Sequence, residues 1–202
     1  MKTNALIIFT RNPELGKVKT RLAKTIGDKN ALEVYIRLLL HTMKVTQSLD
    51  CDKFVFYDTK IETNDLWLET MYEKRIQSGV DLGVRMQDAF QQIFELGYKN
   101  CIIVGSDLFD LQDYHIDEAF YKLQFNDGVI GPAEDGGYYL LGLKKVIPSI
   151  FKNKNWGTSN ILSATLKDLE NYKIEFTETL NDIDTFEDLE KSNYYKISKN
   201  QL

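Results

Sequence analysis

The chain of 202 residues contains little cysteine or proline and has no long apolar run. Cys51 and Cys101 lie fifty residues apart without a metal-type spacing, which predicts a reducing, cytoplasmic location and no disulfide framework. With only three prolines there is no proline-rich linker, so we expect one domain over residues 1–202. No apolar run approaches the roughly 20 residues that span a membrane, so no membrane span is expected.

The sequence also has only two histidines and no excess of basic charge. Each of these features argues against a class of function. The two histidines, His41 and His115, fall within or next to predicted helices. We therefore expect structural roles for them and no triad of nucleophile, histidine and carboxylate. The net charge of -5 and the isoelectric point near 5.2 argue against nucleic-acid binding. The five apolar residues from Ala5 to Phe9 are too few for a secretory signal.

The charge that is present is unevenly distributed along the chain. Residues 1–25 carry six basic side chains against one acidic side chain, whereas residues 170–190 carry eight acidic side chains against one basic side chain. This asymmetry has two interpretations: plain surface variation, or one end that binds phosphate and another that binds a metal ion. Composition alone does not choose between them.

Short apolar runs alternate with segments of helical periodicity. The predicted strands cover residues 5–9, 54–57, 101–104, 129–130, 138–143 and 173–177. The predicted helices cover residues 29–49, 82–96, 114–125, 159–171 and 185–195, with one more in the polar segment that ends near Gln77. This alternation indicates an α/β domain with a largely parallel sheet. Ligands of such sheets bind beyond the carboxyl ends of the strands.

The loop after the first predicted strand carries four cations, which are Arg11, Lys17, Lys19 and Arg21. It is neither a P-loop nor a Gly-x-Gly-x-x-Gly loop, because the required glycines are missing. Lysine and arginine at this place can neutralise a di- or triphosphate. A solvated basic loop is the alternative, and its position after the first strand favours phosphate binding.

Acidic residues follow the third predicted buried strand and recur near the C-terminus. Asp107 ends the segment Gly105-Ser106-Asp107, where a carboxylate is well placed to hold a hard divalent cation. A strand-end aspartate also serves as a helix cap, so this signal is weak by itself. In the acidic tail, helix capping explains Thr185 and Asp188. Asp182 and Asp184 are then left as second-site metal ligands.

The segment Asp135-Gly136-Gly137 lies just before the predicted strand at 138–143. Paired glycines allow a positive φ or a close approach of the backbone to a ligand. Asp-Gly and Gly-Gly are also strong turn formers. On composition alone, a hairpin turn is the better interpretation.

Six segments in this order carry a family resemblance that spans residues 9–189. They are Phe9-x-Arg11-x-Pro13-x-x-Gly16-x-Val18-Lys19-Thr20-Arg21-Leu22, Asp81-Leu82-Gly83-x-Arg85-Met86-x-x-Ala89-Phe90, Gly105-Ser106-Asp107, Gly131-Pro132-Ala133-x-Asp135-Gly136-Gly137-Tyr138-Tyr139-Leu140-Leu141-Gly142-Leu143, Trp156-Gly157-Thr158-Ser159 and Asp182-Ile183-Asp184-Thr185-x-Glu187-Asp188-Leu189. The chain resembles the bacterial selenodomain-associated glycosyltransferases of the nucleotide-diphospho-sugar transferase (GT-A) superfamily. It is also similar to phospholactate guanylyltransferases and molybdenum-cofactor nucleotidyltransferases. The resemblance implies a three-layer, Rossmann-like GT-A fold with a mostly parallel mixed sheet.

The resemblance also implies roles for residues at matching positions. The implied nucleotide-binding residues are Arg11, Lys17, Lys19, Arg21 and Arg85. The implied catalytic residues are Asp107, Lys19 and Arg21. The implied ligands of Mg²⁺ or Mn²⁺ are Asp107 with Asp182 or Asp184. The turn of Asp135, Gly136 and Gly137 would shape the acceptor side.

Three functions are compatible with this resemblance. The first is a metal-dependent glycosyltransferase that uses a nucleotide-sugar donor and a small-molecule acceptor. The second is a nucleotidyltransferase that moves a nucleoside monophosphate from a triphosphate to a phosphorylated acceptor. Relatives carry proline two residues after the metal-binding aspartate, whereas this chain has Phe109. This departure keeps open a third function, a non-catalytic nucleotide-binding protein. Many tyrosines and phenylalanines lie outside the predicted strands. Core or surface packing is the better interpretation of them, and the interface of an oligomer is the alternative.

Overall fold

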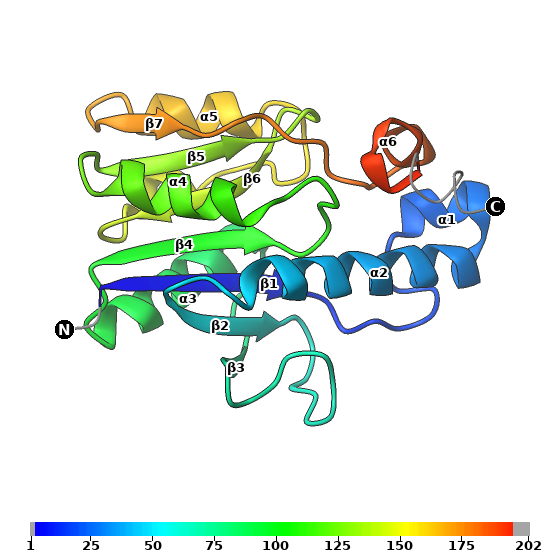
Figure 1. Ribbon diagram of the computed structural model, residues 1–202. Coiled ribbons are helices and arrows are strands. Elements are labelled where there is room, and N and C mark those ends of the chain that lie inside the picture. The colour runs from blue at the N-terminus through cyan, green and yellow to red at the C-terminus, as the bar shows by residue number, and fades with distance from the viewer. Residues whose placement is uncertain (1–2, 196–202) are drawn as a thin grey trace.

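A seven-stranded sheet runs through the molecule in the order β3-β2-β1-β4-β6-β5-β7 (Figure 1). The computed structural model describes residues 3–195. The strands are β1 (Asn4–Thr10), β2 (Asp52–Tyr57), β3 (Tyr72–Ile76), β4 (Asn100–Gly105), β5 (Gly128–Pro132), β6 (Tyr138–Leu143) and β7 (Ile174–Phe176). Strand β6 is antiparallel to β4 and β5, and the other neighbouring strands pair in parallel. The predicted mostly parallel mixed sheet is therefore confirmed.

Helices cover both faces of this sheet and complete three layers. They are α1 (Thr20–Ile26), α2 (Asp28–Thr46), α3 (Leu82–Glu95), α4 (Asp113–Leu123), the 3₁₀ helix η1 (Pro148–Phe151), α5 (Ile161–Asp168) and α6 (Phe186–Lys191). Side chains of α2 and α4 pack in one core, and those of α3, η1 and α5 pack in another on the opposite face. Within residues 3–195, the helices are too short or too polar to cross a membrane.

Strand β1 shows why its sequence is an uninterrupted apolar run. Successive side chains of a strand point to opposite faces of the sheet. Leu6 and Ile8 accordingly lie in the core shared with α2 and α4, whereas Ala5 and Ile7 lie in the core shared with α3. Both faces of the strand are buried, as expected for the centre of an α/β sheet. With neighbours on both sides, β1 has its carboxyl end near the middle of the row of strand ends.

A third, smaller apolar cluster joins the two ends of the chain. Leu22 of α1 and Leu38 of α2 pack there with Ile183 and Leu189 from the C-terminal segment. Helices α1, α2 and α6 meet at the same end of the molecule (Figure 1). This packing brings the basic N-terminal part of the sequence close to its acidic C-terminal part.

Side-chain caps confirm where two helices begin. The Asp81 carboxylate accepts a hydrogen bond from the Val84 amide at 2.9 Å, at the start of α3. Thr185 and Asp188 form the predicted capping box of α6, in which the Asp188 carboxylate accepts from the Thr185 amide at 2.7 Å. These contacts account for Thr185 and Asp188 as structural residues.

Two sequence predictions about secondary structure differ from the fold. The helix predicted in the polar segment before Gln77 is wrong, because residues 72–76 form β3 at the edge of the sheet. An edge strand is only partly covered, so its charged residues hide the apolar pattern of a buried strand. In addition, the predicted basic loop ends early, since α1 begins at Thr20.

Candidate active site

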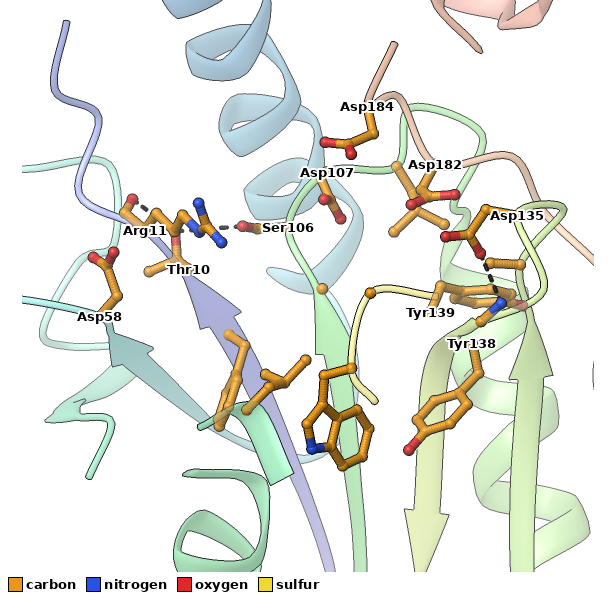
Figure 2. Close-up of a pocket in the computed structure, with 18 of the residues that line it drawn as sticks. Thr10, Arg11, Asp58, Ser106, Asp107, Asp135, Tyr138, Tyr139, Asp182 and Asp184 are labelled. Carbon is orange, nitrogen blue, oxygen red and sulfur yellow. Dashed lines mark hydrogen bonds between the residues drawn. The ribbon is translucent and has the colours of Figure 1, made fainter. Parts of the chain in front are cut away.

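A cavity of about 690 Å³ lies beyond the carboxyl ends of β1 and β4 (Figure 2). The predicted site residues that line it are Arg11, Lys19, Arg21, Arg85, Asp107, Asp135, Gly137, Asp182 and Asp184. They come from both charged ends of the sequence and from the middle of the chain. Lys17 and Gly136 were also predicted, but they do not line the cavity.

Backbone hydrogen bonds hold the acidic C-terminal segment over the end of β4. The Leu180 amide donates to the Pro132 carbonyl at 3.1 Å, which fixes the segment beside β5. Farther along, the Ile183 amide donates to the Asp107 carbonyl at 3.2 Å. Because Ile183 is anchored in this way, its neighbours Asp182 and Asp184 lie near Asp107 (Figure 2). The carboxylates are thus gathered from two distant parts of the sequence.

Lys19 and Arg21 connect the basic loop to these carboxylates. The Lys19 Nζ atom lies 2.9 Å from Asp107 Oδ2 and 3.7 Å from Asp184 Oδ1. The Arg21 guanidinium lies 2.9 Å from Asp184 Oδ2. The Lys19 side chain is buried, whereas Arg21 is largely exposed. In the inner pair, Lys19 is therefore shielded from solvent although Asp107 is partly exposed, and solvent screens the outer pair of Arg21 and Asp184.

The inner pair is ionised on both sides. Burial by itself would lower the pKa of the Lys19 ammonium, but the neighbouring carboxylates of Asp107 and Asp184 outweigh burial and raise this pKa. Burial likewise acts to raise the pKa of Asp107, but the charge and hydrogen bond of Lys19 and the charge of Arg11 lower it. Each group keeps its partner charged near neutral pH.

Asp182 differs from Asp107 because no cation pairs with it among residues 3–195. Its burial and the negative charges of Asp107 and Asp135 raise its pKa to about 7. A carboxyl group with such a pKa binds a proton or a metal ion readily near neutral pH. Asp182 thus lacks the counter-ion that Asp107 and Asp184 have.

The donor set of the cavity fits Mg²⁺ or Mn²⁺. Asp107, Asp182, Asp184 and Asp135 gather on one side of the cavity (Figure 2), and carboxylate oxygens are the ligands that hard divalent cations prefer. The ammonium of Lys19 already forms a hydrogen-bonded ion pair with Asp107. Within residues 3–195, no three acidic, histidine or cysteine side chains are already arranged as a metal-binding group. Metal binding therefore requires a rearrangement of these side chains.

Tyr35 of α2 holds the ends of β1 and β4 together. Its hydroxyl accepts a hydrogen bond from the Arg11 amide at 2.9 Å and lies 3.5 Å from Ser106 Oγ. It also lies 3.4 Å from Thr10 Oγ1. Tyr35 belongs to the buried stripe of α2, which has the apolar periodicity of a helix. The contacts of its hydroxyl were not predictable from that pattern, because its partners are distant in the sequence.

Further lining residues were missed by sequence reasoning. The Gln77 side-chain amide donates to the carbonyls of Thr10 and Phe56 at 3.1 and 2.9 Å, which ties the residue after β3 to β2 and to the end of β1, where the loop begins. Asp58 accepts a hydrogen bond from the Asn12 amide at 2.8 Å in the same loop. Both residues line the cavity. Their only sequence signal is their position immediately after strands.

Arg85 lines the cavity, and a hydrogen bond to the backbone holds its side chain. Its Nε atom donates to the Gly79 carbonyl at 3.0 Å. Gly83, two residues earlier in the same helix, has no room for a side chain, since an added Cβ would lie 2.6 Å from the Trp156 ring. Trp156 also lines the cavity. The start of α3 and the Trp156 loop therefore form one packed wall.

The Asp135-Gly136-Gly137 segment has both features that its sequence suggested, a turn and a glycine with a positive φ. It forms a turn between β5 and β6, in which the Asp135 carboxylate accepts from the Gly137 amide at 2.7 Å. Gly136 has a φ of +88°, and an added Cβ would lie 2.2 Å from the Ser159 carbonyl oxygen. Asp135 and Gly137 face the cavity, whereas Gly136 packs the turn against the Ser159 loop.

Lys17 and Phe109 lie away from the cavity lining. Lys17 is exposed and forms an ion pair with Glu14 at 2.6 Å. Phe109 packs against His41 and Tyr194, with ring centroids 4.7 and 5.2 Å apart. Phe109 thus packs against α2 and against the C-terminal part of the described chain. The change at position 109 does not place a side chain in the cavity.

Both histidines make structural contacts. The His41 Nε2 atom lies 2.7 Å from the Leu111 carbonyl oxygen. The Gln112 amide donates to His115 Nδ1 at 2.9 Å, at the start of α4. Neither residue lines the cavity.

Comparison with known structures identifies the class of fold. The chain is similar to a protein from Desulfovibrio desulfuricans G20 that is provisionally assigned as a nucleotide-diphospho-sugar transferase. The two are 28% identical with a TM-score of 0.88, over 99% of this chain and 95% of the other. The molecule therefore has the nucleotide-diphospho-sugar transferase fold, which confirms the predicted superfamily. Over residues 40–158 the sequence also matches the family described as "uncharacterized protein conserved in bacteria" (DUF2064), and the chain belongs to this family.

More distant structures share the fold alone. A 4-diphosphocytidyl-2C-methyl-D-erythritol synthase from Anaerococcus prevotii is 12% identical, with a TM-score of 0.58 over 97% of this chain and 99% of the other. A CMP-2-keto-3-deoxy-manno-octonic acid synthetase in complex with CTP is 9% identical, with a TM-score of 0.60 over the whole of both chains. A Mycobacterium tuberculosis protein in complex with manganese is 8% identical, with a TM-score of 0.58 over 94% of this chain and 97% of the other. No curated protein matches the sequence.

Proposed function

We propose that this protein is a metal-dependent transferase that uses a nucleotide-activated donor and a small-molecule acceptor. The observation that carries the proposal is the arrangement of charges on a single cavity. Arg11 and Lys19 come from the loop after β1 and Arg21 from the start of α1, and Asp107 and Asp182 lie at the end of β4 and above it. Phosphate groups suit the first set, and a divalent cation suits the second.

The residues of the chain supply positioning and electrostatic stabilisation. Arg11 and Arg21 bind phosphate oxygens of the donor and orient it, and Arg85 is a further phosphate ligand on the opposite wall. Lys19 stabilises the negative charge that develops on the leaving phosphate group. Such a reaction depends on geometry and charge and needs no covalent nucleophile. This agrees with the structural roles of both histidines. Lys17, which is exposed and paired with Glu14, is left out of the proposed site.

Asp107 and Asp182 would hold the metal ion, with Asp184 as the alternative second ligand. When bound, Mg²⁺ or Mn²⁺ neutralises phosphate charge as a Lewis acid. Asp135 and Gly137 line the cavity beside these carboxylates and shape the rim where we place the acceptor. The fold similarity to a manganese-bound protein supports this metal assignment only at the level of the fold.

We favour glycosyl transfer as the reaction, because the 28% identical structure that spans nearly the whole chain is provisionally assigned as a nucleotide-diphospho-sugar transferase. The second candidate is nucleotidyl transfer. It is favoured by the cationic loop itself, because three cations suit the extra phosphates of a nucleoside triphosphate better than those of a nucleotide sugar.

Product analysis separates the two reactions. The protein is incubated with Mn²⁺, a mixture of candidate acceptors, and either nucleotide sugars or nucleoside triphosphates. Glycosyl transfer releases a nucleoside diphosphate, whereas nucleotidyl transfer releases pyrophosphate. Release of pyrophosphate alone would replace the first candidate by the second. Release of neither, from a protein that nevertheless binds nucleotide, would favour the non-catalytic function.

The unpaired carboxyl group of Asp182 should make stability depend on pH. Its pKa of about 7 in the folded protein lies above the ordinary value of 3.8, so the folded state binds more protons than the unfolded state between these values. Its stabilising contribution is present below about pH 4 and is lost as pH rises through 7. In metal-free buffer, Asp182→Asn should therefore raise the free energy of unfolding by about 1 kcal/mol at pH 8.

Thermal denaturation with a chelator at pH 4.5 and pH 8 checks this result. The stabilisation by Asp182→Asn should be larger at pH 8 than at pH 4.5. Asp184→Asn is the matched control, because Asp184 is paired with Arg21 and its loss should not stabilise the protein at pH 8. An equal effect of Asp182→Asn at both pH values would contradict the assigned pKa.

The hydroxyl of Tyr35 should contribute both to stability and to nucleotide binding. Tyr35→Phe removes the acceptor of the Arg11 amide and loosens the loop after β1. We expect the free energy of unfolding in urea to fall by about 1 to 2 kcal/mol. Nucleotide affinity should fall by roughly 3- to 10-fold, because the loop that binds phosphate is less well positioned.

Tyr72→Phe is the matched control for Tyr35→Phe. The Tyr72 hydroxyl lies 3.0 Å from Thr46 Oγ1 in the same core, but Tyr72 does not line the cavity. This variant should lose a similar amount of stability and keep its nucleotide affinity. The positioning role of Tyr35 is wrong if both variants bind nucleotide equally well.

A further inference from the structure

The buried ammonium of Lys19 occupies the place where a metal ion is expected. Its side chain is only 6% exposed, and a buried lysine requires a charged or polar partner. The partners of Lys19 are Asp107 at 2.9 Å and Asp184 at 3.7 Å. Both carboxylates belong to the set that we assign to the metal ion. A metal ion and an ammonium cannot both lie against the same Asp107 oxygen without strong repulsion.

The backbone of the chain fixes Lys19 in this place. Lys19 has the left-handed conformation, with a φ of 47° and a ψ of 43°, which is uncommon for a residue other than glycine. It is also the residue before α1, and its carbonyl accepts from the Ala23 amide at 2.8 Å. Leu22 anchors that helix in the third apolar cluster. The strained conformation is thus held by surrounding contacts.

The ammonium has hydrogen-bonding capacity that these contacts leave unused. A lysine ammonium carries three N–H donors. Within the part of the chain that the structure describes, Asp107 is the one acceptor at hydrogen-bonding distance from Lys19 Nζ. Lys19 also lines the cavity. Its remaining donors are therefore available to a ligand that enters the cavity.

We propose that Lys19 is a built-in counter-ion, which holds Asp107 and Asp184 together in the metal-free protein and is displaced when a divalent cation binds. The displaced ammonium then takes a phosphate group of the donor as its new partner. This inference rests on the proposed function, because it requires a metal ion and a phosphorylated donor in the same cavity. It implies that Lys19 weakens metal binding when no nucleotide is present.

The test is Mn²⁺ binding without nucleotide, measured from the electron paramagnetic resonance signal of free Mn²⁺. Lys19→Met removes the competing cation, so it should bind Mn²⁺ about tenfold more tightly than the wild type, or better. Arg21→Met is the matched control. It also removes one positive charge near the carboxylates, but Arg21 contacts Asp184 and not Asp107, and it is largely exposed. Its gain in affinity should stay below roughly threefold.

Two further results make this test decisive. If Lys19→Met does not fold, Lys19→Gln keeps a donor for Asp107 without the charge and should show the same gain in Mn²⁺ affinity. The inference is overturned if the Lys19 variant binds Mn²⁺ no more tightly than Arg21→Met. In that case wild-type Mn²⁺ binding still supports the proposed function. Absence of Mn²⁺ binding in every variant and in the wild type would overturn both.

Discussion

Asp107→Asn should lower metal-dependent turnover by about 100- to 1,000-fold. Asparagine keeps the shape of the side chain but removes the charge that pairs with Lys19 and that would bind the metal ion. The carboxylate lies at the end of a central strand, and its pKa is lowered by Lys19 and Arg11 in spite of its burial. Its charge is therefore maintained near neutral pH, and its removal should affect every step that needs the metal ion.

Steady-state kinetics at a series of Mn²⁺ concentrations measures this loss. Asp110→Asn is the matched control, because Asp110 lies three residues later in the same loop and does not line the cavity. It should retain nearly full turnover. Circular dichroism must show that the Asp107 variant is folded, since the substitution leaves the buried Lys19 ammonium with Asp184, 3.7 Å away, as its remaining charged partner. A folded Asp107→Asn protein with wild-type turnover would contradict the assignment of the metal ligand.

Gly136→Ala should cause the largest loss of stability among single substitutions in the site. The φ of +88° disfavours any side chain, and the new Cβ would lie 2.2 Å from the Ser159 carbonyl oxygen. A backbone oxygen cannot rotate away, so the turn or the Ser159 loop must shift. We expect the free energy of unfolding to fall by about 2 to 4 kcal/mol, and the melting temperature to fall by roughly 5 to 15 °C.

Gly157→Ala separates the two causes of this loss. Gly157 has a similar φ of +76°, but no atom lies within 4 Å of the position of its added Cβ. It should therefore lose only the conformational part, about 1 kcal/mol. Calorimetry of the two variants gives the steric part as their difference. Equal losses would mean that the close contact between Gly136 and Ser159 does not exist.

Buried apolar runs made the centre of this fold predictable from the sequence. Strands β1 and β4 are covered on both faces, so their sequences are uninterrupted apolar segments. Asp107 lies two residues after the end of β4, and the rule for ligands of parallel sheets then places it in the site. The edge strand β3 was missed because its residues are mostly charged or half-buried. The hydrophobic pattern of a strand is weak where its residues are only partly buried.

Contacts between distant residues could not be predicted from the sequence. The Tyr35 hydroxyl meets Ser106, which lies 71 positions away, and a helical stripe says nothing about where its polar atoms bond. In the sequence, Lys17 and Lys19 are equivalent as cations of the loop. In the structure, Lys17 is exposed, whereas Lys19 is buried and paired with Asp107. That difference arises from the left-handed turn at Lys19 and the packing of α1. It is a property of the tertiary structure.

The most direct test of the account is a thermal-shift measurement with nucleoside triphosphates and nucleotide sugars, each with and without Mn²⁺. Ligands that bind only the folded state raise the melting temperature. We predict that at least one nucleotide raises it, that Mn²⁺ increases this shift, and that Asp107→Asn loses the increase. If no nucleotide raises the melting temperature with or without Mn²⁺, the proposal of a metal-dependent transferase with a nucleotide-activated donor is wrong.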